Sequence, residues 1–137
     1  MPIAAGRQVL RIAAENLRGR TSFAVETTLA GHNYLRMMRN ARAQGYSVIL
    51  VYLGTGDVNI NLVRISHRVL IGGHDVPEPD VRRRYTRSLR NLPEAISRAD
   101  HAILLDNSTD EGYRLVAVMG KDQKEWFHPI PSWVPQL

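Results

Sequence analysis

Residues 47–53 have the sequence SVILVYL, and they give the strongest single indication of the fold class. A strand over 48–53 would carry apolar side chains on both faces, because the side chains of a strand alternate between its faces. Strands of this kind are typical of parallel sheets that have helices on both sides. We therefore predict that residues 48–53 lie at the centre of a parallel sheet.

Four helices are predicted around this strand, because apolar residues recur there at helical spacing. They cover residues 6–20, 31–44, 58–71 and 79–98. Gly45 lies where a left-handed cap would end the second helix, and Asp57 can cap the start of the third. The fourth helix begins near a proline, which the first turn tolerates, and Pro93 could break it.

Three further strands are predicted. Residues 22–26 form a short apolar run between polar turn residues, which indicates an interior strand, and residues 101–106 form another. Residues 113–119 have the pattern of an edge strand, and the tail from Glu125 is predicted to be irregular. The alternation of helix and strand predicts an α/β layer fold with mostly parallel pairing, in a single domain over residues 1–137.

The composition favours the binding of anions. Eighteen lysines and arginines against thirteen aspartates and glutamates give a formal net charge of +5, and sixteen of the eighteen are arginine. Because a planar guanidinium binds phosphate oxygens two at a time, nucleotides, nucleic acids and acidic lipids all suit this surplus. The absence of cysteine excludes disulfides and thiolate sites. With no pattern of a signal peptide or membrane span, we expect a soluble, cytoplasmic protein.

Residues 64–90, RISHRVLIGGHDVPEPDVRRRYTRSLR, hold seven of the arginines. Arg64 and Arg68 share one helix face, where like charges repel unless an anion lies between them, although a solvated basic face is the commoner outcome. A second cluster, residues 82–84, follows across the glycines at 72 and 73. Guanidiniums on both sides of a glycine hinge are typical of a lid that closes over a transferred phosphate.

Polar side chains follow the predicted strands at the edge where ligands of parallel sheets bind. Glu26 could accept a hydrogen bond from a substrate hydroxyl or could cap a turn, and Thr27 and Thr28 have the same two interpretations. His74 could donate to a phosphate, act in proton transfer or stabilise its turn. Asn107 could shape a nucleotide pocket or form an Asx turn. The histidines have no metal-site spacing, so no metal site is predicted.

Several motifs together resemble the zeta-toxin-like kinases, especially the bacterial branch of small predicted ATPases. The resemblance rests on AGR at 5–7, SFAVETTLAG at 22–31, GYSVILVYL at 45–53, RISHRV at 64–69, GGHDVP at 72–77, RRRY at 82–85 and DNS at 106–108. These motifs occur in the family's order from residue 5 to about residue 107. The resemblance implies a three-layer P-loop kinase-like fold with a mostly parallel sheet.

The resemblance also implies an activity: transfer of the terminal phosphate of ATP or GTP, with Mg²⁺, to a hydroxyl of a small substrate such as a UDP-N-acetylhexosamine. By position, Glu26 would bind the sugar substrate. Arg64 or Arg68 and Arg83 or Arg84 would hold the triphosphate and stabilise the charge that develops during transfer. The sequence does not decide between the members of each pair.

One departure from the family is large. Its members begin with a strand, a GxxxxGK[ST] loop and a second strand that ends in the catalytic aspartate, whereas this sequence has no lysine before Lys121. In the family fold the missing first strand lies between the strands represented here by 22–26 and 48–53. We therefore expect a gap in the sheet, closed by direct pairing of these two strands, by a strand from another copy or by a separate chain.

The leading functional prediction is a truncated kinase domain that is inactive or weakly active alone but still binds nucleotides or UDP-sugars. A second hypothesis is a catalytically dead interaction module that binds an intact partner or an antitoxin. A third is a basic nucleic-acid-binding protein, which is disfavoured because few aromatic residues are interleaved with the arginines.

Overall fold

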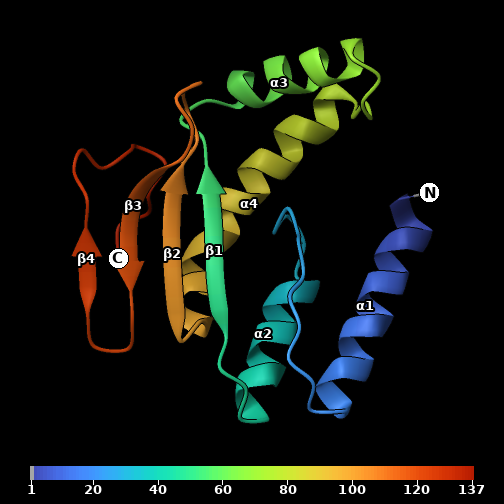
Figure 1. The fold of residues 1–137 in the computed structure, drawn as a ribbon, viewed down its shortest axis with the longest axis vertical. Helices are drawn as coiled ribbons and strands as arrows, with labels where there is room; N and C mark the ends of the chain where they lie inside the picture. The colour runs from blue at the N-terminus through green and yellow to red at the C-terminus, as the bar shows by residue number, and fades with distance from the viewer. Residues whose placement is uncertain (1) are drawn as a thin grey trace.

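The computed structural model describes residues 2–137, without the side chains of Pro2 and Ile3. Figure 1 shows a twisted sheet with one long helix behind it and the N-terminal helices, in blue and teal, beside it. In chain order the elements are α1 (Pro2–Arg18), α2 (Asn33–Ala43), β1 (Ile49–Gly54), α3 (Val58–Leu70), α4 (Glu78–Arg98), β2 (His101–Asp106), β3 (Arg114–Met119) and β4 (Lys124–Trp126). The mixed α/β class predicted from the sequence is confirmed.

The four predicted helices all form, and the two predicted capping residues, Asp57 and Gly45, act as expected. The Asp57 side chain accepts a hydrogen bond from the Asn59 N–H at 2.9 Å at the start of α3. Gly45 has a φ of +88° just beyond the end of α2, a conformation that glycine adopts without steric cost. The expectation that Pro93 could break α4 is wrong, since α4 continues through it to Arg98.

The strand order is β1-β2-β3-β4. β1 and β2 are parallel and are joined by α3 and α4, while β2–β3 and β3–β4 are antiparallel. The predicted mostly parallel pairing is therefore wrong: one of these three strand pairs is parallel. The predicted edge position of 113–119 is also wrong, because β4 pairs with β3 at the start of the tail that was expected to be irregular.

The main core lies between the sheet and α4. Leu92 of α4, Leu104 of β2 and Val116 of β3 are each fully buried there. A smaller core joins Leu29 and Leu35 to α4. Burial of these side chains fixes α4 against one face of the sheet, as Figure 1 shows.

β1 lies at an edge of the sheet, so its predicted central position is wrong. Among the described residues, β2 is the one strand that pairs with it. Leu50 and Tyr52 pack against the cores, whereas Ile49, Val51 and Leu53 are 63%, 56% and 50% exposed. The continuous apolar pattern that predicted a central strand is thus present, but one face of it is uncovered.

Residues 21–30 contain no strand, which contradicts the prediction for 22–26. The segment runs as an extended loop between α1 and α2, and within it Ala24, Val25 and Glu26 are exposed rather than interior (Figure 1). Strand geometry requires a hydrogen-bonded neighbour, and no such pairing is formed by this segment in the described structure. Closure of the expected gap by direct pairing of 22–26 with β1 is therefore not observed.

Within residues 2–137, no helix combines the length and the apolar character needed to cross a membrane.

Candidate functional site

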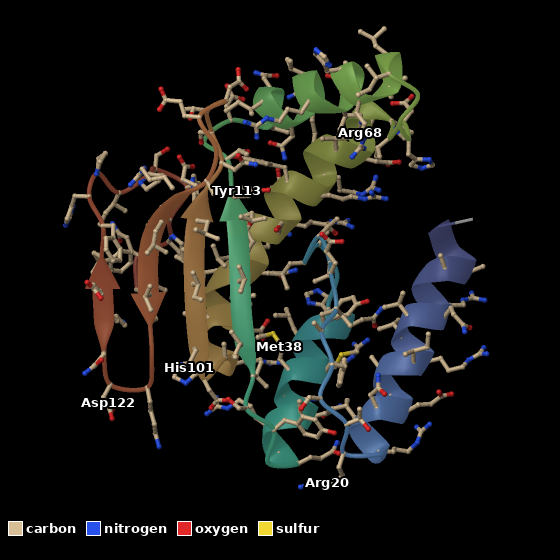
Figure 2. The ribbon with its side chains drawn as sticks, viewed as in Figure 1. Arg20, Met38, Arg68, His101, Tyr113 and Asp122 are labelled. Carbon is tan, nitrogen blue, oxygen red and sulfur yellow. The ribbon has the colours of Figure 1, made fainter. Side chains whose placement is uncertain are left out.

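A groove of about 1040 Å³ lies between residues 22–29 and β1. Its floor is formed by apolar side chains of α2 and α4, and Figure 2 shows Met38 projecting from α2 on this side. Among the residues that line it, two carry a charge, Glu26 and Arg84. The groove is therefore mainly apolar, with one acid and one base on its walls.

The carboxyl end of β1 supplies further polar groups to the groove. The Tyr85 hydroxyl donates to the Thr55 carbonyl at 2.8 Å, and the Thr55 hydroxyl donates to the Asn61 side-chain oxygen. These contacts tie the β1–α3 turn to α4. They place hydroxyl and amide groups at the edge of the sheet where ligands of parallel strands bind.

The predicted substrate residues lie on the loop that forms one wall. Glu26, Thr27 and Thr28 all line the groove and are exposed. The Thr27 hydroxyl accepts a hydrogen bond from the Leu29 N–H at 3.0 Å, so Thr27 also forms a local turn. The Glu26 carboxylate makes no hydrogen bond or ion pair to the described part of the chain, which leaves it available to a hydroxyl donor.

The two predicted arginines of α3 bind backbone carbonyls. Arg64 donates to the Asn107 carbonyl and, at 3.2 Å, to the Thr109 carbonyl, which ties α3 to the loop after β2. Arg68 donates to the His74 carbonyl at 3.1 Å, and Figure 2 shows it at the α3 end of the molecule. Both guanidiniums thus hold loops in this conformation, and neither lines the groove.

The three arginines at the start of α4 differ in their surroundings. Arg82 forms an ion pair with Glu78 at 2.9 Å, and Arg83 forms one with Asp80 at 2.8 Å. Arg84 is half-buried, lines the groove, and makes no hydrogen bond or ion pair with residues whose side chains are described. The structure therefore brings Arg84 and Glu26 to one cavity, without Arg64, Arg68 or Arg83.

The loop after β2 is held by its own network. Asp106 accepts hydrogen bonds from the Ser108 hydroxyl at 2.7 Å and from the Trp133 indole N–H at 2.8 Å. The Asn107 N–H donates to the Gly54 carbonyl at 2.8 Å. This network fixes the carboxyl ends of β1 and β2 side by side, and Asn107 contributes to it through its backbone rather than its side chain.

The comparisons with known proteins give one relative and no family. The chain is 37% identical over 83 residues to an uncharacterized protein of Haemophilus influenzae. The match covers 61% of this chain and spans 59% of the length of that relative. No family model matches the sequence, and no solved structure matches it either.

Tyr52 and Tyr85 belong to this region and were not singled out by the sequence, since nothing in the pattern distinguishes a groove tyrosine from a core one. The Tyr52 hydroxyl shares a hydrogen bond of 2.8 Å with Ser88. Burial raises the pKa of Tyr52 above its usual 10.0, partly offset by this hydrogen bond. Burial also raises the pKa of Tyr85, and the nearby carboxylate of Asp57 raises it further.

The raised pKa of Tyr52 predicts a loss of stability in alkali. A raised folded-state pKa means that the stabilising contribution is complete below 10.0 and is lost as the pH rises through the folded value. At neutral pH, Tyr52→Phe should lower the free energy of unfolding by about 1 kcal/mol, because the hydrogen bond to Ser88 is lost. As the pH rises above ~10, the free energy of unfolding of the variant should fall less than that of the wild type. Urea unfolding across this pH range checks it, and parallel curves for the two proteins would contradict it.

The groove residues fit only part of the ATP, GTP and Mg²⁺ group that the resemblance implies. Arg84 and the side-chain amide nitrogen of Asn61 offer donors to phosphate oxygens, whereas the Thr55 hydroxyl already donates to the Asn61 side-chain oxygen. The described residues contain no group of three histidine, aspartate or glutamate side chains suited to a metal ion. The sequence has no P-loop lysine. The residues present therefore fit an anion but not the complete Mg²⁺–nucleotide group, and no transfer step follows from them.

Proposed function

We propose that this chain is a zeta-toxin-like kinase domain that keeps the substrate wall and the lid of the fold but lacks the part that grips the nucleotide. It binds phosphorylated small molecules, such as ATP, GTP or a UDP-N-acetylhexosamine, and alone it transfers phosphate weakly or not at all. The single observation that carries this proposal is the placement of Arg84 and Glu26 in one groove.

The parallel pair around the groove supports a P-loop kinase-like fold, although helices cover β1 on one face rather than on two. β1 and β2 are parallel, and the helices that connect them carry the arginine motifs. The groove also lies between residues 22–29 and β1, where the family would have its P-loop strand. A sheet that lacks this strand would leave β1 at an edge, as is observed.

The two charged groups of the groove have distinct chemical roles. Arg84 is a half-buried guanidinium that can bind two phosphate oxygens in parallel. The Glu26 carboxylate can accept hydrogen bonds from two neighbouring hydroxyls of a sugar. A UDP-N-acetylhexosamine offers a diphosphate to Arg84 and the hydroxyls of its hexose to Glu26, whereas ATP and GTP offer three phosphates and only the hydroxyls of a ribose.

Calorimetric titration with ATP, GTP and UDP-N-acetylglucosamine tests this proposal. Arg84→Ala should weaken binding of all three ligands about tenfold, because a charge-assisted hydrogen bond is lost from a partly desolvated site. Arg87→Ala is the matched control, since Arg87 is an exposed arginine of the same helix outside the groove. Glu26→Gln should weaken UDP-N-acetylglucosamine more than ATP.

The absence of heat with all three ligands would contradict the proposal, as would equal effects of Arg84→Ala and Arg87→Ala. The expected low transfer activity is a separate readout. Release of phosphate or formation of a phosphorylated sugar at rates typical of kinases would show that the described residues are sufficient for catalysis.

A further inference from the structure

Within residues 2–137, one hydrogen-bonding edge of the β1 backbone has no partner strand. The Val48 and Gly54 carbonyls accept hydrogen bonds from residues of the β2 side, at 2.8 Å from the Asp100 N–H and 2.8 Å from the Asn107 N–H. Successive residues of a strand direct their N–H and C=O groups to opposite edges. The N–H and C=O groups of Ile49, Val51 and Leu53 therefore face away from β2, into the groove.

The opposite wall of the groove has unpaired backbone as well. Within residues 2–137, no backbone-to-backbone hydrogen bond is formed by residues 22–28. The segment is nevertheless held in place, because the buried Asn91 side chain donates to the Leu29 and Gly31 carbonyls at 2.8 and 3.2 Å. Two extended backbones with free donors and acceptors thus line one cavity.

The shape of the groove selects its occupant. Its volume of about 1040 Å³ reaches the upper end of small-molecule pockets, which span roughly 300–1,000 Å³. Pairing of β1 with the β1 of a second copy is disfavoured. The second copy's β1 would fill the groove, and the β2 on its far edge would then overlap residues 22–28 of the first copy. A single strand has no such neighbour and can be flanked by both walls.

We propose that the groove accepts one β-strand from a separate polypeptide, which pairs with β1 and fills the space beside residues 22–28. This partner goes beyond the proposed binding of nucleotides and does not depend on it. β1 has six residues, so the inserted strand spans about six residues or roughly 20 Å.

The chemistry of the walls defines the sequence of this strand. Leu50, Met38 and Leu89 contribute apolar surface to the groove, and its two charges lie on residues 26 and 84. A charged side chain in the middle of the strand would lose its hydration without gaining a partner. The occupant is therefore an uncharged segment rich in β-branched residues, with any acidic group placed near Arg84.

A labelled probe peptide tests the proposal on the full chain. The probe has six alternating valine and threonine residues between terminal lysines, and its control carries N-methyl groups on alternate residues, which removes the donors of one edge. Fluorescence anisotropy should show saturable binding of the probe and at least about tenfold weaker binding of the control. Hydrogen exchange of the Ile49, Val51 and Leu53 amides should slow about tenfold or more when the probe is bound.

Variants of β1 separate edge pairing from apolar adsorption. Val51→Pro removes a donor that faces the groove, and edge strands tolerate proline at such positions. Val51→Thr keeps the donor and changes the side chain, so it should bind the probe within about twofold of the wild type while Val51→Pro loses binding. Circular dichroism establishes that each variant is folded, and the exchange experiment on the wild type remains decisive if Val51→Pro is not.

Three results would overturn the proposal. One is the absence of saturable probe binding, and another is equal binding of the probe and its N-methylated control. The third is a dimer by light scattering in which the three β1 amides are already protected without the probe, because a second copy would then be the occupant. The first two results leave the response of nucleotide calorimetry to Arg84→Ala unchanged, because that response depends on the Arg84 side chain and not on the β1 amides. The two proposals can therefore fail separately.

Discussion

Gly54→Ala is expected to lower the free energy of unfolding by about 3 kcal/mol, the upper range for overpacking a core. A Cβ atom at this position would lie 2.4 Å from Cε2 and 2.6 Å from Cδ2 of Trp133. The indole cannot easily move aside, because it is buried, hydrogen bonded to Asp106 and packed 5.7 Å from the Tyr52 ring. The end of β1 must therefore shift.

Urea unfolding measures this effect, and Gly56→Ala is the matched control. A Cβ at position 56 would meet one atom at an ordinary 3.5 Å, the Ser108 hydroxyl oxygen, so its cost should stay within about 1 kcal/mol. Combining Gly54→Ala with Trp133→Leu should cost less than the sum of the single changes, because the clash is removed. Equal costs for the two alanine variants would contradict the packing of Trp133 against β1.

Asn91→Ala has the second large expected effect, a loss of about 3 kcal/mol. The side chain is 6% exposed and donates to the Leu29 and Gly31 carbonyls at 2.8 and 3.2 Å. Its removal leaves a buried carbonyl without a donor. Leu29 also has a φ of +59°, an unfavourable conformation for a leucine, which these contacts help to hold.

The same variant should loosen one wall of the groove. Backbone NMR order parameters in residues 22–31 are expected to fall more than those in β2 and β3, because Asn91 links this loop to α4. Asn40→Ala is the control, since Asn40 is an exposed asparagine of α2 and should change stability by less than about 0.5 kcal/mol. An Asn91→Ala protein with wild-type stability would contradict the role of this link.

The helices and the strands β1 and β2 could be predicted from the sequence because their signals are local. Asp57 caps α3 and Gly45 follows α2 in a left-handed conformation, as their residue types indicate. Pro93 shows the limit of such rules. Packing of Leu92 and Ala95 against the core keeps α4 continuous through a residue that disfavours a helix.

Strand neighbours could not be predicted, because pairing depends on segments far away in the sequence. An apolar run like that of β1 is compatible with a central strand and with an edge strand, so it does not show how many neighbours the strand has. Residues 22–26 have a strand-like composition, but without a neighbouring strand they remain an extended loop. No pattern in the tail predicted that Trp133 packs against Gly54 at the end of β1.

The candidate site was predictable in part. Glu26, Thr27, Thr28 and Arg84 all line the groove, but Glu26 lies on an extended loop and not at the end of the predicted strand over 22–26. The number of arginines alone could not show which of them pair with carboxylates of their own helix and which one lines the groove. Arg82 and Arg83 have carboxylates three or four residues earlier on the same helix, a spacing that indicates local ion pairs.

The exposed edge of β1 has a cost for the protein inside a cell. It carries no lysine and no proline to discourage association with other strands. Copies whose edge is uncovered are therefore open to misassembly and to degradation, and their lifetime is governed by chaperones and proteases. A molecule that covers this edge should consequently raise the abundance of the chain.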